Sequence, residues 1–144
     1  MTMNITSEIN DFYYRMALHE LQMMNEGDYY NGLSYNSILY INVIALMEED
    51  CTVSGLAEAL KVTKSAVTLK VNELVKQGAV ERVQSEEDRR VYRLKLTPGM
   101  RRTVGLYDQV FDRIGSEIRK KYSEEELKLF GEILHTISGY EWRK

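Results

Sequence analysis

Residue types that usually mark a chemical site are scarce in this 144-residue sequence. Its one cysteine, Cys51, excludes an intramolecular disulfide framework and a metal site of several thiolates. Its two histidines, His19 and His135, lie too far apart in the chain to suggest a local ligand pair. Gly-rich phosphate loops, paired metal-ligand spacings and a nucleophile elbow are also missing. These absences argue against an enzyme, a structural metal and a bound cofactor.

Long apolar runs are missing as well. No stretch reaches the roughly 18 uninterrupted apolar residues of a membrane span, and the N-terminal MTMNITSEINDFYY lacks the basic and apolar regions of a signal peptide. With 44% apolar residues, the chain can nevertheless bury a sizeable core. We therefore expect a globular, cytoplasmic protein with no membrane partner.

The stretch from Thr52 to Gly78 predicts two short helices joined by a tight turn. Each carries one apolar stripe at helical spacing. The stripe residues are Val53, Leu56, Ala57 and Leu60, then Val67, Val71, Leu74 and Val75. Thr52 and Thr63 are candidate N-caps, and Gly78 stands where a helix ends in a left-handed residue. With so short a connection the stripes meet only if the helices cross steeply, which predicts a helix-turn-helix.

The second of these helices leaves a polar, basic face opposite its apolar stripe. Small hydroxyls and an amide suit base edges in a major groove, and lysines suit phosphates, so this face is typical of a recognition helix. An ordinary solvated face is the alternative. The candidate DNA-binding residues are Lys64, Ser65, Thr68, Leu69, Lys70, Asn72 and Lys76. We expect Ser65, Thr68 and Leu69 to read bases and the three lysines mainly to hold phosphates, because the N-terminal half of a recognition helix enters the groove.

The charge distribution supports this interpretation although the whole chain carries −3. Residues 61–102 contain eleven Lys or Arg and five acids, a net +6, which leaves −9 for the remainder. A basic region within an acidic protein matters more to DNA than the total charge.

The other segments predict helices and one β-hairpin. Helical periodicity runs from Ile5 to about Asn25, and a largely apolar core helix, capped by Ser34, runs from Tyr35 to about Glu48. Thr97 and Pro98 begin a helix that continues to about Tyr122, and Ser123 with Glu126 forms the capping-box pattern of a last helix. Gly27, Asp28, Asn31 and Gly32 should end the first helix.

The hairpin is predicted from residues 79–84 and 91–96, with a charged tip between them. Strict alternation predicts that Tyr92, Leu94 and Leu96 face inward and that Arg93 and Lys95 face outward. A hairpin placed directly after a helix-turn-helix is a wing.

The order of elements resembles the multiple antibiotic resistance regulator (MarR) family of bacterial winged-helix transcription factors. The family pattern S-x-x-T-x-x-V-x-x-L-x-x-x-G-x-V-x-R, with D-x-R and L-T after it, is matched by Ser65, Thr68, Val71, Leu74, Gly78, Val80, Arg82, Asp88, Arg90, Leu96 and Thr97. The resemblance implies an obligate homodimer that places a winged helix from each subunit on DNA. It also implies that Arg90 reaches into the minor groove, which a guanidinium fits, and we expect Asp88 to turn inward and brace the wing. The candidate wing residues are Asp88, Arg89, Arg90 and Arg93.

The expected fold is therefore mainly α with a small β-hairpin wing. Residues 34–98 would form the winged helix-turn-helix, and residues 1–33 and 99–144 the flanking dimerisation helices, whose apolar stripes need a partner. Intramolecular packing of those stripes on the core helix is the alternative.

The expected function is sequence-specific binding of double-stranded DNA by a transcriptional regulator, a ligand-responsive repressor on a pseudo-palindromic operator. A winged-helix protein-interaction module without DNA binding is the alternative. Relatives bind aromatic effectors, and the residues that would line such a site are Met16, His19, Tyr35, Tyr40 and Tyr107, which fit a plain core or interface equally. A redox role for Cys51 is a further alternative, opposed by Glu48, Glu49 and Asp50, whose charges would raise its pKa.

Overall fold

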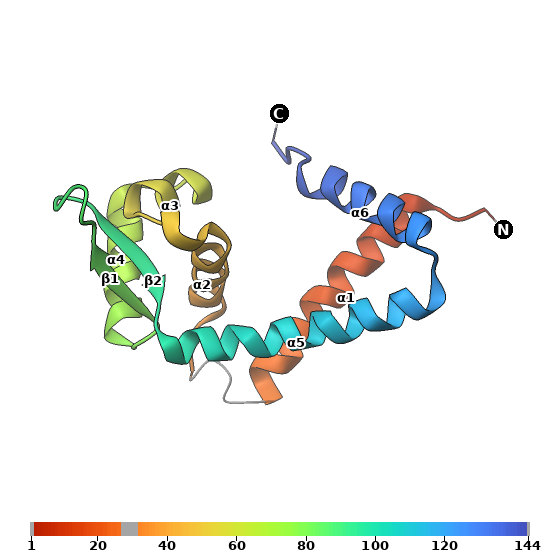
Figure 1. Cartoon of the computed structure of the whole chain (residues 1–144), viewed down its shortest axis with the longest axis horizontal. Coiled ribbons are helices and arrows are strands. Elements are labelled where there is room, and N and C mark those ends of the chain that lie inside the picture. Colours follow the sequence, from red (N-terminus) through yellow and green to blue (C-terminus); the bar gives the residue numbers. More distant parts are fainter. Residues whose placement is uncertain (1, 27–31, 144) are drawn as a thin grey trace. The chain divides into compact units, whose positions relative to one another are not determined.

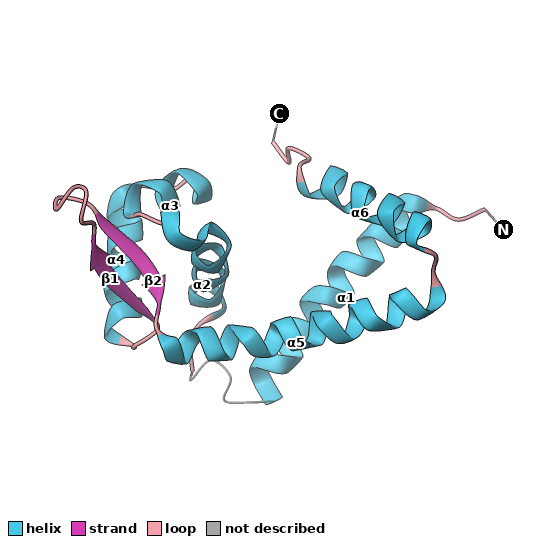
Figure 2. Cartoon of the chain, in the orientation of Figure 1, coloured by secondary structure: helices cyan, strands magenta, loops and turns pink. Residues whose placement is uncertain are grey.

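The computed structural model describes residues 2–26 and 32–143, and within them the chain is mainly helical with one two-stranded hairpin (Figures 1 and 2). The element order is α1 (Ile5–Glu26), α2 (Tyr35–Met47), a 3-10 turn η1 (Glu48–Asp50), α3 (Val53–Leu60), α4 (Lys64–Lys76), β1 (Val80–Gln84), β2 (Tyr92–Leu96), α5 (Pro98–Lys121) and α6 (Glu124–Ser138). This confirms the predicted fold class. Two compact units, residues 1–104 and 105–144, make up the chain.

Side-chain caps determine where three helices of the first unit begin. The hydroxyl oxygens of Ser34, Thr52 and Thr63 each accept a hydrogen bond from the backbone N–H three residues later, at 3.1, 3.0 and 3.1 Å. Each bond satisfies a donor that a helix start leaves unpaired, and each contributes about 1 kcal/mol. All three predicted caps are confirmed. The residues expected to end α1, except Gly32, lie outside the described residues.

Left-handed residues end α3 and α4. Lys61 has φ 56° and forms the turn between the two helices, while Gly78 has φ 76° and follows α4. Gly78 adopts this conformation without strain because it has no Cβ, as the sequence predicted. The N–H groups of Gly78 and Ala79 bond to the carbonyls of Val75 and Leu74, so the chain turns directly from α4 into β1.

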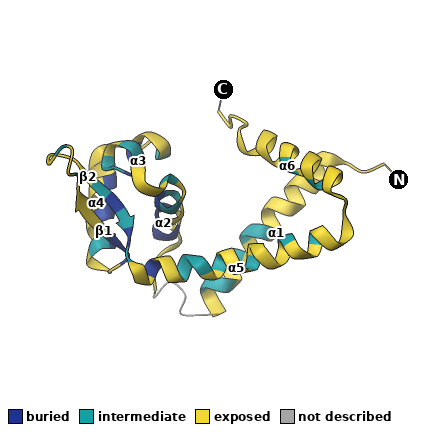
Figure 3. Cartoon of the chain, in the orientation of Figure 1, coloured by how far each residue is buried: buried dark blue, intermediate teal, exposed yellow. Residues whose placement is uncertain are grey.

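One core joins α2, the helix-turn-helix and the hairpin (Figure 3). Its largest fully buried apolar side chains are Ile38, Ile41, Ile44, Cys51, Leu56, Val67, Val71, Leu74, Val80 and Leu94. These include three residues of the predicted α4 stripe, Val67, Val71 and Leu74, while its fourth, Val75, is half-buried, and they include Leu56 at the centre of the α3 stripe. The core holds α4 by its apolar side and therefore leaves the opposite side in solvent.

The wing is an antiparallel ladder in which Val80 pairs with Leu96, Arg82 with Leu94 and Gln84 with Tyr92. The N–H of Leu94 also donates to the carbonyl of Cys51 at 2.8 Å, which ties β2 to the segment before α3. Leu94 and Leu96 are buried as predicted. The inward prediction for Tyr92 is wrong, because it lies at the tip end of the ladder beyond the last core residue and is 47% exposed.

Thr97 joins the hairpin to α5. Its N–H donates to the carbonyl of Ala79 at 3.0 Å and its hydroxyl donates to the carbonyl of Gly78 at 2.7 Å. The same hydroxyl accepts the N–H of Met100 at 3.3 Å, so it also caps α5, with Pro98 as first residue of the helix. Pro98 lacks an N–H at a position where a helix does not need one. The end of α4, the start of β1 and the start of α5 thus meet at one threonine.

The second unit contains most of α5 and all of α6. Ser123 and Glu126 form the predicted capping box, with bonds of 3.1 and 2.9 Å. Neither α6 nor α1, in the other unit, has a buried residue, and both are exposed along most of their length (Figure 3). Within this unit, α5 and α6 border an open groove of about 600 Å³ lined by Ile118, Tyr122, Leu127 and Leu134, among others.

No helix among residues 2–26 and 32–143 is both long and apolar enough to cross a membrane. The same residues contain no group of three or more His, Cys, Asp or Glu side chains arranged to hold a metal ion.

Candidate nucleic-acid interface

The outward face of α4 carries the predicted base-reading residues. Ser65, Thr68 and Leu69 are all exposed, and Leu69 has 73% of its surface in solvent although it is apolar. An isolated large apolar side chain on the exposed side of a helix suits contact with a thymine methyl group. Lys64 and Lys76 are exposed at the two ends of the same helix.

Lys70 differs from these two lysines because it is directed into the protein. Its side chain is 18% exposed, and its ammonium lies 3.2 Å from the hydroxyl of Ser37 and 3.2 Å from a carboxylate oxygen of Glu73. Ser37 is fully buried on α2 and also receives a hydrogen bond from the Ser34 hydroxyl. Lys70 therefore fixes α4 against the first turn of α2, and its role as a phosphate ligand stays a prediction.

Asn72 makes a contact that joins α4 to the wing. Its Oδ1 accepts a hydrogen bond from Nη2 of Arg82 on β1, and both side chains are exposed. Arg82 was counted in the basic region but not among the site residues. The alternation of side chains along a strand could have predicted that Arg82 faces α4, because it lies two residues after the buried Val80 and so on the same side of β1.

The wing tip is ordered by Asp88. Its Oδ1 accepts hydrogen bonds from the backbone N–H and from Nε of Arg90, both at 3.1 Å, and its Oδ2 accepts one from Nη2 of Arg90 at 3.2 Å. The side-chain and backbone hydrogen bonds from Arg90 hold the pKa of the Asp88 carboxyl below its usual value. The Arg90 side chain stays 90% exposed. Next to this pair, Gln84 Nε2 donates to the carbonyl of Arg89 at 2.8 Å, while Arg93 is half-buried on β2.

The five candidate effector-binding residues are distributed over both units. Met16 is half-buried and His19 exposed on α1, whereas Tyr35 and Tyr40 belong to α2 and Tyr107 to the second unit. Tyr40 is only 8% exposed and is part of the winged-helix core. Burial, with a smaller contribution from the Glu20 carboxylate, raises the pKa of the Tyr35 hydroxyl. Whether these residues bind a ligand stays a prediction.

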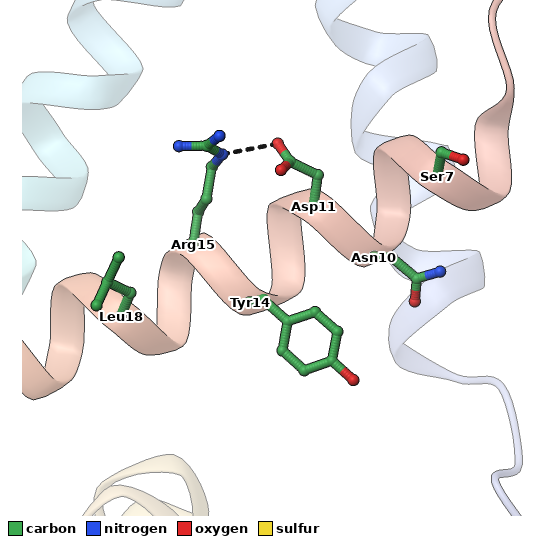
Figure 4. Close-up of a pocket in the computed structure, with 6 residues that line it drawn as sticks. All are labelled: Ser7, Asn10, Asp11, Tyr14, Arg15 and Leu18. Carbon is green, nitrogen blue, oxygen red and sulfur yellow. Dashed lines mark hydrogen bonds and ion pairs between the residues drawn. The ribbon is translucent and has the colours of Figure 1, made fainter.

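A separate open hollow runs along α1 between Ser7 and Leu18 (Figure 4). Its polar side chains include Asp11 and Arg15, whose ion pair of 2.8 Å spans one helical turn. The hollow is formed by one helix alone and is not enclosed, so it has the character of a solvated helix surface.

Cys51, the residue directly after η1, is fully buried. Burial raises the pKa of its thiol to about 11, so the reactive thiolate is rare at neutral pH. The direction of this shift was predicted, but its cause is burial and not the three neighbouring acids. A buried thiol with a raised pKa has the properties of a structural cysteine.

Known proteins provide the family assignment. A sequence model of the MarR family matches residues 31–91. FabT of Streptococcus pneumoniae, solved in complex with DNA, is 30% identical to this chain, covers 92% of it with 94% of its own length, and superposes with a TM-score of 0.61. The chain belongs to the MarR family. It is also 26% identical over 107 residues to the HTH-type transcriptional regulator BilQ of Clostridioides difficile strain CD3. The matched stretch spans 74% of this chain and 69% of BilQ.

The MarR fold extends over nearly the whole chain. A MarR-like transcriptional regulator of Thermotoga maritima superposes with a TM-score of 0.67 and covers 96% of this chain and 100% of its own, at 24% identity. The chain is therefore a MarR family transcriptional regulator with a DNA-binding winged helix, and its family is one of regulators and not of enzymes. The resemblance inferred from Ser65 to Thr97 is confirmed.

Proposed function

We propose that this protein is a homodimeric, ligand-responsive repressor that binds a pseudo-palindromic operator. The observation that carries this proposal is the exposed face of α4, on which Ser65, Thr68 and Leu69 stand free of the core within a basic region of the chain. In the proposed complex, α4 of each protomer enters a major groove and Arg90 of each wing enters the adjacent minor groove. FabT, which is 30% identical to this chain, has been solved in complex with DNA, and this supports DNA as the partner of the chain's own winged helix.

Exposed apolar residues on α1 and α6 support a dimer. On α1 they include Ile5, Ile9, Phe12 and Leu21, and on α6 they include Phe130, Ile133, Leu134 and Ile137. Such long apolar stripes are an aggregation hazard unless another surface covers them. A second copy would cover them, and it would present two winged helices to two half-sites about one DNA turn apart. Two linked sites bind far more tightly than one.

Selection of bound sites from a random DNA pool tests the DNA-binding part of the proposal. The expected product is a site with two inverted half-sites, bound in a gel shift much more tightly than random DNA. A winged helix used only for protein interaction would enrich no sequence and would not shift random DNA even in low salt, where nonspecific phosphate contacts are strongest.

Sedimentation equilibrium at low micromolar concentration tests the dimer. We expect a dimer that dissociates only when it unfolds, and a chain lacking residues 1–25 should be insoluble. A folded monomer at these concentrations would contradict the proposal.

A response to a small aromatic molecule completes the proposal. The Tyr35 hydroxyl and the His19 imidazole would supply polar contacts and Met16 an apolar one, a combination suited to an aromatic ring with one polar substituent. A panel of phenols and aromatic acids should contain a compound that releases the selected DNA, and its effect should be lost in His19→Ala and Tyr35→Phe. If every compound leaves the complex intact, the ligand-responsive part of the proposal fails while DNA binding stands.

A further inference from the structure

Asn72 and Arg82 form a pair that the proposed function does not yet use. We propose that the two residues together clamp one DNA phosphate at the junction of α4 and the wing, and that Asn72 therefore does not read a base. This inference rests on the proposed DNA-binding function and adds a contact to it.

The two residues come from neighbouring elements of the winged helix, Asn72 from α4 and Arg82 from β1. Asn72 follows the buried Val71 on α4, and Arg82 lies two residues after the buried Val80 on β1. The core therefore holds both backbones, while both side chains remain in solvent and meet through the hydrogen bond from Arg82 Nη2 to Asn72 Oδ1. Holding the two side chains in place before DNA arrives lowers the entropy lost when they bind it.

The hydrogen bond determines which groups the pair presents. An asparagine that reads adenine uses its amide oxygen as acceptor and its amide NH₂ as donor at the same time. Here the oxygen of Asn72 is engaged by Arg82, so the NH₂ group is what Asn72 presents. Arg82 has five N–H donors and no acceptor, and Asn72 is its one hydrogen-bond partner within residues 2–26 and 32–143. The pair offers donors and one positive charge, which matches a phosphate and not an adenine edge.

The position of the pair favours the DNA backbone as well. Asn72 is in the C-terminal half of α4, one turn after Thr68 and one turn before Lys76, and later residues of a recognition helix point toward the backbone. The carboxylate of the adjacent Glu73 is paired with Lys70. Phosphate contacts fix the orientation of a protein on DNA without carrying sequence information. The clamp would therefore set the angle between α4 and the wing on the duplex.

Four single variants test the clamp on the selected operator and on random DNA, each over a salt series. Arg82→Gln should weaken binding about tenfold on both DNAs and reduce the slope of log K against log salt by ~0.9 per protomer, close to 2 for a dimer. Arg82→Lys should keep the slope and lose only part of the affinity, because it retains the charge. Asn72→Ala should weaken binding about threefold on both DNAs without changing the selected base preferences.

Asn72→Asp is the decisive variant. It keeps an acceptor for Arg82 but replaces the donating NH₂ with negative charge, so it should weaken binding at least tenfold on both DNAs. All of the substituted side chains are exposed, and a thermal melt monitored by circular dichroism should show intact folding. Arg113→Gln, an exposed arginine of α5, controls for loss of one charge elsewhere and should bind nearly as the parent does.

Two results would overturn the clamp. If Asn72→Asp binds as tightly as the parent or tighter, the pair is an internal brace that does not touch DNA. If Asn72→Ala changes the preferred base at one operator position, Asn72 reads sequence. Both results are distinct from failure of the proposed function, in which the parent protein itself would bind no DNA.

Discussion

Asp88 accepts three hydrogen bonds from Arg90, two from the guanidinium and one from the backbone N–H, within a span of three residues. The pair closes the wing tip on itself. It also holds a guanidinium whose side chain is 90% exposed and whose Nη1 group has no partner among the described residues. Asp88 accepts hydrogen bonds as expected of a residue that braces the wing, but its side chain is 44% exposed and not turned inward, and its role in DNA binding stays a prediction.

The first prediction is that Asp88→Ala weakens DNA binding even though it removes a negative charge. Without the carboxylate, the Arg90 side chain must be ordered when DNA binds, and that ordering costs about 1–2 kcal/mol. Arg90→Ala should weaken binding further and reduce the salt slope by ~0.9 for each lost phosphate contact. Glu86→Ala, at the same tip, is the control and should bind as tightly as the parent or tighter. Tighter binding by Asp88→Ala would mean that Asp88 is only a repulsive charge near DNA.

The second prediction concerns the acid titration of Asp88. Hydrogen bonds from Arg90 lower its pKa in the folded protein below the usual 3.8. Its contribution to the ordered wing is therefore complete above pH 3.8 and is lost as the pH falls through the lower, folded value. The carboxyl carbon chemical shift, followed by NMR, should give a midpoint below 3.8 in the parent and a higher midpoint in Arg90→Ala, which keeps only the backbone hydrogen bond to Asp88. The same midpoint in both proteins would show that Arg90 is not the cause.

The third prediction separates base reading from phosphate contact on α4. Thr68→Ala should cost roughly 1–3 kcal/mol on the selected operator and little on random DNA. Lys64→Gln, also exposed on α4, should instead weaken binding to both DNAs equally. Quantitative gel shifts at fixed salt measure both differences. Equal losses for Thr68→Ala on the two DNAs would show that Thr68 does not read sequence.

The fourth prediction is that the Cys51 thiol is inert in the folded protein. With a pKa near 11, raised by burial from 9.0, it is almost entirely protonated at pH 8. Its contribution to stability is complete below pH 9.0 and is lost as the pH rises through about 11. Reaction with a thiol reagent at pH 8 should be slow in buffer and immediate in denaturant. Rapid labelling of the folded protein, or loss of DNA binding after mild peroxide treatment, would instead support a redox role.

The fifth prediction is a stabilising substitution at Glu48. This residue follows α2 with φ 53° and ψ −123°, a conformation that costs a side chain about 1–3 kcal/mol and that glycine adopts readily. Glu48→Gly should therefore raise the free energy of unfolding by about 1 kcal/mol, measured by urea denaturation. Glu48→Ala is the matched control, since it removes the same charge but keeps the Cβ. If both variants are equally stable, the backbone conformation of Glu48 does not lower the free energy of unfolding.

Local chemistry explains why so much of the fold was predictable. Ser34, Thr52, Thr63 and the Ser123 capping box each act within four residues, so the sequence next to them contains all that decides where those helices begin. The apolar stripes of α3 and α4 could be predicted for the same reason, because helical spacing alone puts their residues on one side. The recognition face then follows as the side that remains.

Contacts between elements were not predictable in this way. Tyr92 satisfies the alternating pattern of a buried strand, but burial also requires a neighbour above it, and the hairpin extends past its neighbours at that end. Lys70 lies on the flank of the recognition face, yet its ammonium finds Ser37, 33 positions earlier in the sequence. The bond from Arg82 to Asn72 likewise joins a strand to a helix. Such pairings depend on where the core places each backbone, which no local pattern encodes.

Thr97 makes the recognition helix and α5 mechanically dependent on each other. Its hydroxyl holds the carbonyl of Gly78, just after α4, and at the same time caps the first turn of α5. A tilt of that first turn must either carry the end of α4 with it or break a bond of 2.7 Å. Thr97 therefore couples a movement of α5 to a movement of α4. In Thr97→Val, which removes the shared hydroxyl but keeps the shape of the side chain, the end of α4 and the first turn of α5 could move independently.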